Sequence, residues 1–176
     1  YEITTRLVGS EMCIRDRGIC LFSFAVKKYD IPLGASVYPH KEVEFIKINH
    51  LKGNILVNFG LGSFVSYKLY PNNLIFMDGR YEEVYYDEMV PLLDKFYVLK
   101  PGWDDVLKKY PPDIMIIEKY YPVYDLLNTL KDWKNVYDAE TFAVFVRAKD
   151  AKPTYLLPSE DIEYYKNTLF DTDIKF

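Results

Sequence analysis

The sequence predicts an α/β fold: a three-layer, Rossmann-like sandwich with a mostly parallel sheet and a C-terminal antiparallel hairpin. Strand-like and helix-like segments alternate along the chain, which is typical of parallel strands connected by helices. The strand segments "NILVN", "LIFM" and "IMII" are continuously apolar, as strands covered on both faces tend to be. The last two strand-like segments alternate between apolar and polar residues and meet at a tight turn, which predicts the hairpin.

Two N-terminal segments stand apart from this pattern. "LVGSEMCIRDR", within residues 1–17, has no helical or strand period and resembles translated sequencing-adapter sequence, so we expect Leu7, Val8 and Ile14 to lie outside the core. A natural, disordered N-terminus is the alternative. Residues 18–37 begin with "GICLFSFAV", which is too short to cross a bilayer. This segment is either an extra strand or the end of a lost transmembrane helix.

Residues 38–150 carry the periodicities of one α/β domain, and prolines mark its helix boundaries. Pro39 suits the first turn of the first helix, Pro71 ends the second, and Pro91 limits where the next can begin. Residues 151–176 are expected to form a polar tail with a helix that starts at Ser159, a good N-cap residue. The further helices are expected at 38–49, 61–70, 102–110 and 122–130, and the strands at 54–58, 73–78, 113–119, 133–140 and 141–148.

Composition and motifs exclude several functional classes. The formal net charge is −4, which argues against the basic surface that binds nucleic acid. Cys13 lies in the adapter-like segment, so Cys20 is left without a partner for an internal disulfide. His40 and His50 lack metal-ligand spacing, and Ser63 is not in a nucleophile elbow. We therefore predict no metal site and assign no catalytic residue.

A glycine pair after the first strand is the sharpest candidate for a cofactor site. Gly60 and Gly62 follow the strand that ends at Asn58, and Asp78 closes the next strand. This order is close to a dinucleotide-binding fingerprint, but the third glycine position is Val65 and the helix is short. A tight strand-to-helix turn is the favoured interpretation, and no cofactor is predicted. A nucleotide or S-adenosylmethionine-type cofactor stays open as the alternative.

Four segments together carry a family resemblance: "YPHKEVEFIK", "GNILVNFGLGSFVSYKLYPNNLIFMDGR", "GWDDVLKKYPPDIMII" and "DWKNVYDAETFAVFVR". They resemble the C-terminal soluble region of bacterial multi-spanning membrane glycosyltransferases of the GT-C-like type. The likeness covers residues 38–147, and "DGR" is its most specific piece. The chain departs from the family at residues 62–64, with Gly-Ser-Phe in place of Gly-Gly-Tyr. This departure puts in doubt any role that rests on a second glycine.

The resemblance implies a non-catalytic, extracytoplasmic domain of a membrane protein that acts on lipid-linked sugars. Its first partner would be a transmembrane region of the same chain, missing upstream, and a lipid-linked sugar would be a second. The family's catalytic acids are expected between transmembrane helices, so none transfers to this sequence. A free-standing Rossmann-like enzyme with a nucleotide-type cofactor and a non-catalytic interaction module remain as alternatives.

The Asp78-Gly79-Arg80 segment allows two interpretations. As a structural corner, Arg80 would pair with Asp78 or with loop carbonyls; as a ligand site, it would bind an anion such as a lipid-linked phosphate. We favour the structural corner. The strands at 54–58 and 73–78 are expected to be parallel neighbours, which would bring Asn58, Gly60 and Asp78 to one edge of the sheet.

Overall fold

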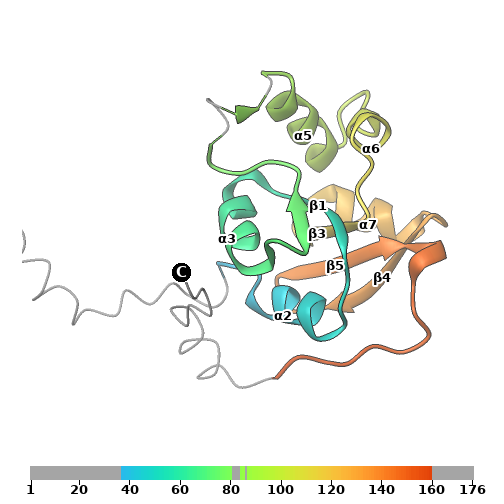
Figure 1. The fold of residues 1–176 in the computed structure, drawn as a ribbon. Coiled ribbons are helices and arrows are strands. Elements are labelled where there is room, and N and C mark those ends of the chain that lie inside the picture. Colours follow the sequence, from blue (N-terminus) through green and yellow to red (C-terminus); the bar gives the residue numbers. More distant parts are fainter. Residues whose placement is uncertain (1–36, 81–83, 86, 160–176) are drawn as a thin grey trace, which may run out of the picture. The chain divides into compact units, whose positions relative to one another are not determined.

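The computed structural model describes residues 37–80, 84, 85 and 87–159, and these form a mixed α/β domain (Figure 1). The predictions for residues 1–36 and for a helix after Ser159 fall outside the described residues. The helices are α2 (His40–Ile48), α3 (Phe59–Leu69), α5 (Met89–Val98), α6 (Asp105–Lys109), α7 (Pro122–Thr129) and the 3-10 turn η1 (Ala148–Asp150). The strands are β1 (Gly53–Val57), β2 (Asn73–Ile75), β3 (Ile114–Glu118), β4 (Trp133–Asp138) and β5 (Phe142–Arg147).

The five strands form one open sheet in the order β2-β1-β3-β5-β4. β2, β1 and β3 are parallel, whereas β5 runs antiparallel to both β3 and β4. The predicted parallel core and C-terminal antiparallel hairpin are therefore confirmed. The β4–β5 pairing shifts by one residue between Asn135 and Tyr137, which is a β-bulge.

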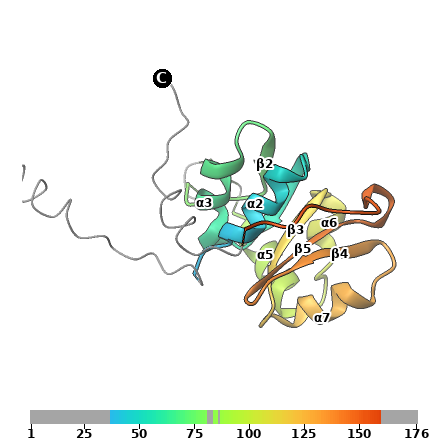
Figure 2. The same ribbon diagram turned by 90° about the horizontal axis from the view of Figure 1, so that it is seen from below.

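Helices lie on both faces of this sheet, as two views at right angles show (Figures 1 and 2). α2 and α3 pack on one face, and α5, α6 and α7 pack on the other. Every residue of β3 is buried, and its side chains alternate between the two sides. Ile114 and Ile116 join the cluster under α2 and α3, whereas Met115 and Ile117 join the other. The continuous apolar run of this strand thus fills two cores at once.

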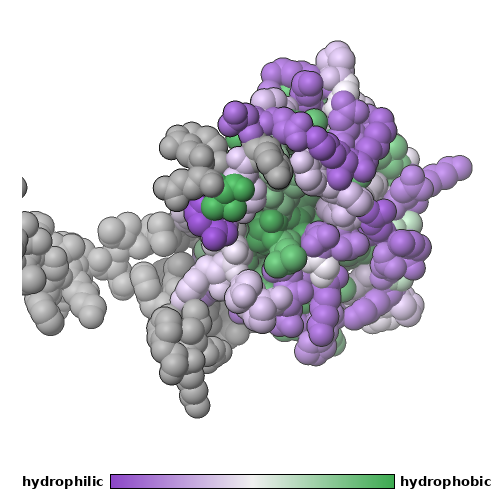
Figure 3. All heavy atoms as spheres, turned by 45° about the horizontal axis from the view of Figure 1, so that its top comes forward, coloured by the Kyte–Doolittle hydropathy of each residue, from purple (hydrophilic) through white to green (hydrophobic). Residues whose placement is uncertain are grey.

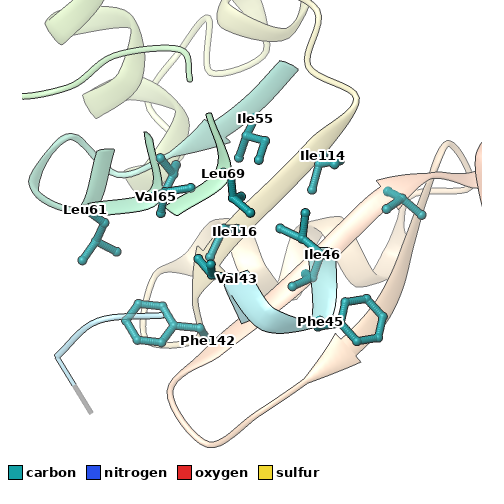
Figure 4. Packing of buried hydrophobic residues seen from close by; sticks show 13 residues of the cluster. Val43, Phe45, Ile46, Ile55, Leu61, Val65, Leu69, Ile114, Ile116 and Phe142 are labelled. Carbon is teal, nitrogen blue, oxygen red and sulfur yellow. The ribbon is translucent and has the colours of Figure 1, made fainter. Parts of the chain in front are cut away.

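Figure 4 shows the packing of the first cluster, in which side chains from α2, α3, β1, β3 and β5 converge. Val43 and Ile46 project from one face of α2, and Val65 and Leu69 project from one face of α3. On the other side of the sheet, the 102–110 segment packs with Val106 fully buried and with Trp103, Leu107 and Tyr110 against the second cluster.

Several element boundaries differ from the prediction for local reasons. β2 ends at Ile75 instead of residue 78, because the chain leaves β1 after Phe76 donates its amide to the carbonyl of Ile55 at 2.9 Å. α3 starts at Phe59, immediately after β1, instead of at residue 61. α6 is shorter than predicted, since residues 101–104 form turns.

The segment after η1 extends along α2 up to residue 159 without forming a helix. Asn49 holds it: its Nδ2 donates to the carbonyl of Leu156 at 2.9 Å, and its Oδ1 accepts from the amide of Leu156 at 2.8 Å. The Tyr155 ring lies 5.3 Å from the ring of Phe45. This attachment was not anticipated from the sequence.

The surface of the domain is mainly hydrophilic on the face drawn in Figure 3, where hydrophobic residues gather near the middle. Among the helices of the described part of the chain, none is both long enough and apolar enough to cross a membrane.

Candidate functional site

Asp78 and Arg80 form a two-pronged ion pair in the loop after β2. Arg80 donates from Nε to Asp78 Oδ1 at 3.0 Å and from an Nη to Oδ2 at 2.7 Å, and its backbone amide also donates to Oδ1 at 3.0 Å. The carboxylate is almost buried, whereas the arginine side chain is 66% exposed. The hydrogen bond from Arg80 is the largest cause that holds the pKa of Asp78 below its ordinary value of 3.8. This geometry matches the expected pairing of Arg80 with a carboxylate.

Gly62 and Gly79 fix the contact between α3 and this loop. A Cβ on Gly62 would lie 2.1 Å from the carbonyl oxygen of Met77, so only glycine allows this close approach. One residue later, the hydroxyl of Ser63 accepts from the amide of Gly79 at 3.1 Å. Both glycines and Ser63 therefore have structural uses.

Asn58 is the N-cap residue of α3, and Gly60 lies in the first turn of that helix. Oδ1 of Asn58 accepts from the amide of Gly60 at 3.2 Å, and the Asn58 carbonyl accepts from the amide of Leu61 at 2.9 Å. Gly60 and Gly62 lie inside α3, not in a loop before it. Asn58 thus already uses two first-turn amides of α3, and the geometry does not favour a dinucleotide at this helix end.

The order of the strands places a crossover point at the carboxyl ends of β1 and β3. From β1 the chain passes through α3 to β2 on one side, and it then returns through α5 and α6 to β3 on the other side of β1. Such crossover points are where open α/β sheets usually bind their ligands. Asn58 follows β1 here, and Glu118 is the last residue of β3.

Glu118 and Tyr97 are the buried polar groups of this point. Glu118 is 3% exposed and Tyr97 of α5 is 4% exposed. Within the described residues, neither Oε2 of Glu118 nor the hydroxyl of Tyr97 has a hydrogen-bond partner. Buried polar atoms are normally hydrogen-bonded, so these two neighbouring atoms call for an explanation.

Burial changes the ionisation of both groups. It raises the pKa of Glu118 from 4.5 to about 7, although the Asn58 side chain partly opposes the shift. The pKa of the Tyr97 hydroxyl rises well above 10, first through burial and then through the charge of Glu118. Near neutral pH, Glu118 therefore exists to a large extent as a neutral carboxylic acid that can both donate and accept a hydrogen bond.

More accessible residues surround these two groups. Nδ2 of Asn58 donates to the hydroxyl of Tyr121 at 3.2 Å, and the Tyr121 ring lies 4.7 Å from the ring of Tyr97 and 4.5 Å from that of Tyr120. Tyr120 is 70% exposed. Gly60 is also exposed, and a Cβ there would meet no described atom within 4 Å. Glu118 and Tyr97 are thus buried beside a more exposed aromatic rim formed by Tyr120 and Tyr121.

The sequence indicated only part of this site. Asn58 and Gly60 were named, and they lie at it; Gly62, Asp78, Gly79 and Arg80 form the structural contact described above. Glu118 was overlooked because it ends a strand that was recognised by its apolar residues. An acid at the end of a buried strand was the available signal, but only the strand order identifies that end as the crossover point.

No protein-family model matches this chain, and no curated protein matches it significantly. Among the described residues, no group of three or more His, Cys, Asp or Glu side chains is placed to hold a metal ion.

Proposed function

We propose that this is a non-catalytic, extracytoplasmic ligand-binding domain of a membrane-embedded glycosyltransferase-like protein, and that it binds a hydroxyl-rich part of a lipid-linked sugar. Its partners would then be a transmembrane region of the same chain and the lipid-linked substrate. We also propose that its sheet belongs to the Rossmann-like three-layer class, because the chain crosses over beside β1 and helices lie on both faces. The parentage rests on the sequence resemblance over residues 38–147.

The observation that carries the binding role is the pair of unpartnered buried oxygens on Glu118 and Tyr97. A neutral carboxyl and a phenol can each donate and accept, which matches the hydroxyl groups of a sugar. The tyrosines of the rim offer flat apolar faces with polar tips, which suit the mixed surface of a sugar ring. A phosphate is a poorer match, because Asn58 already occupies the first-turn amides of Gly60 and Leu61, and Glu118 would repel an anion once ionised.

The binding role is tested by titrating the chain with neutral disaccharides and with a short-chain lipid-linked sugar, while amide NMR shifts are followed. Saturable shifts are expected at Gly60 and Tyr121. Glu118→Leu should abolish them, because leucine keeps the bulk but removes both oxygens, and it leaves no buried charge that would prevent folding. Asp94→Asn is the matched control and should bind normally. Asp94 lies on α5 and forms an exposed ion pair with Lys100.

Two results would contradict the proposal. The binding role fails if no probe shifts these amides, or if Glu118→Leu binds as well as the unaltered chain. The parentage is tested separately by sequencing an intact gene upstream of Gly18. Several apolar stretches of about 20 residues are expected there, each long enough to span a bilayer, and a gene without them would reject the membrane-protein assignment.

A further inference from the structure

A cleft of about 540 Å³ lies between α6 and the β4–β5 hairpin. It is at the amino end of β3, and Glu118 is at the carboxyl end of the same strand. β5 runs antiparallel to β3, and Val146 near its end pairs with Ile114 at the start of β3. The end of β5 and the start of β4 therefore lie by the amino end of β3, whereas Glu118 lies at its carboxyl end. The volume falls within the range of small-molecule sites.

Two tryptophans from separate elements line this cleft. Trp103 precedes α6, and Trp133 begins β4. The Trp103 ring lies 6.4 Å from the ring of Phe96. The guanidinium of Arg147 lies 5.5 Å from the centre of the Trp133 ring, and Nε of Arg147 donates to the carbonyl of Pro112 at 2.9 Å. These contacts hold both rings in place before a ligand arrives, which reduces the ordering cost of binding.

The polar lining carries both signs of charge. Asp104 lies on the α6 side and is paired with Lys108 at 2.7 Å. Exposed Asp132, Lys149 and the half-buried Arg147 lie on the side of the hairpin and η1. A strongly charged ligand would face like charges in such a cleft. A neutral ligand with many hydroxyl groups can donate to the carboxylates and accept from the cations.

From these features we propose that the cleft is a saccharide site that takes neutral pyranose rings against Trp103 and Trp133, with Asp132 and Lys149 bound to ring hydroxyls. The site does not depend on the proposed function, since it lies at the other end of the strands and shares no residue with the Glu118 site. A free oligosaccharide and a glycolipid both present such rings, and the experiment below distinguishes the two sources.

Tryptophan fluorescence reports on this cleft selectively, because the chain contains only two tryptophans and both line it. The chain is titrated with cellobiose, maltose, chitobiose and mannobiose, and we expect a saturable change with at least one of them. Asp132→Ala and Lys149→Ala should each weaken binding by about tenfold, the effect of losing one hydrogen bond to a charged group. Both side chains are exposed, so these variants should fold.

Lys134→Ala is the matched control, because Lys134 is the exposed neighbour of Trp133 on β4 and does not line the cleft. It should bind like the unaltered chain, as should Glu118→Leu, which separates this site from the proposed functional one. An alkyl glycoside of the best disaccharide in phosphatidylcholine vesicles identifies the source: tighter binding than the free sugar indicates a glycolipid, and equal binding a free glycan. The inference is overturned if no disaccharide changes the fluorescence, if Asp132→Ala and Lys149→Ala bind normally, or if a uronic acid or sugar phosphate binds more than tenfold tighter.

Discussion

Glu118 combines a position at the end of the central strand β3 with an environment that opposes its charge. The neutral carboxyl avoids the larger cost of burying a charge, and that further cost appears when the proton leaves. The folded protein therefore holds this proton more tightly than the unfolded chain does. Stability consequently depends on pH in a range where most exposed carboxylates have already ionised.

The first prediction concerns this dependence. The contribution of Glu118 to the free energy of unfolding is fully present below pH 4.5, the unfolded pKa, and is lost as the pH rises through about 7, the folded pKa. The loss should amount to about 3 kcal/mol. Glu118→Gln cannot ionise, so its stability relative to the unaltered chain should increase with pH over this range. Urea unfolding at several pH values measures the difference; parallel curves for the two proteins would show that Glu118 titrates normally.

Arg80 is expected to stabilise the loop after β2 through Asp78. Since the folded pKa of Asp78 lies below 3.8, the contribution of the pair is present above pH 3.8 and is lost as the pH falls through the lower folded value. Arg80→Ala should therefore lower the melting temperature at neutral pH but have little effect in strong acid, where Asp78 is protonated. Thermal melting at both pH values is the measurement. An unchanged melting temperature at neutral pH would favour the anion-site interpretation of this corner.

At the scale of elements, α3 provides a matched pair of glycines. Gly62→Ala should destabilise the domain by about 1–3 kcal/mol, because the new methyl group would overlap the carbonyl of Met77 and push α3 away from the loop. Gly60→Ala, one half-turn earlier in the same helix, meets open space and should stabilise by about 0.4–1 kcal/mol. Urea unfolding of both variants tests the contact, and equal effects would mean that α3 does not need this close approach.

The sequence was most informative about elements whose apolar residues form a pattern within one segment of the chain. The apolar runs of β1 and β3 lead directly to the correct strands. Boundaries set by contacts with distant residues were missed. β2 ends at Ile75, shortly before the point where Gly62 of α3 approaches the carbonyl of Met77, and nothing within residues 73–78 signals that stop.

The candidate site shows the same limit more strongly. Asn58 and Gly60 could be named because they follow a strand and begin a helix, which is a local pattern. The relevance of Glu118 and Tyr97 depends on the strand order and on the return of α5 over the second face of the sheet. Residues far apart in the chain become neighbours only through that topology, so reading each segment alone did not identify them.

At the scale of the whole molecule, the segment after η1 ties the end of the described chain back to α2. Asn49→Ala removes both hydrogen bonds to Leu156 and should lower the free energy of unfolding by about 1–3 kcal/mol, since Asn49 is buried and its loss leaves the Leu156 groups unpaired. Hydrogen exchange at the Leu156 amide should accelerate as well. Asn72→Ala, at an exposed asparagine, is the control; unchanged exchange at Leu156 in Asn49→Ala would show that the segment is held by other contacts.

The bulge between Asn135 and Tyr137 has a consequence for how copies of this domain behave when crowded. It interrupts β4, one of the two outer strands, and β2 at the other border is only three residues long. An outer strand that is regular and long offers its free amides and carbonyls to a strand from another molecule, which is how sheets grow into aggregates. An irregular strand on one side and a very short one on the other both make poor templates. The sheet is thereby protected against self-association through its edges, while its two ends remain available for ligands.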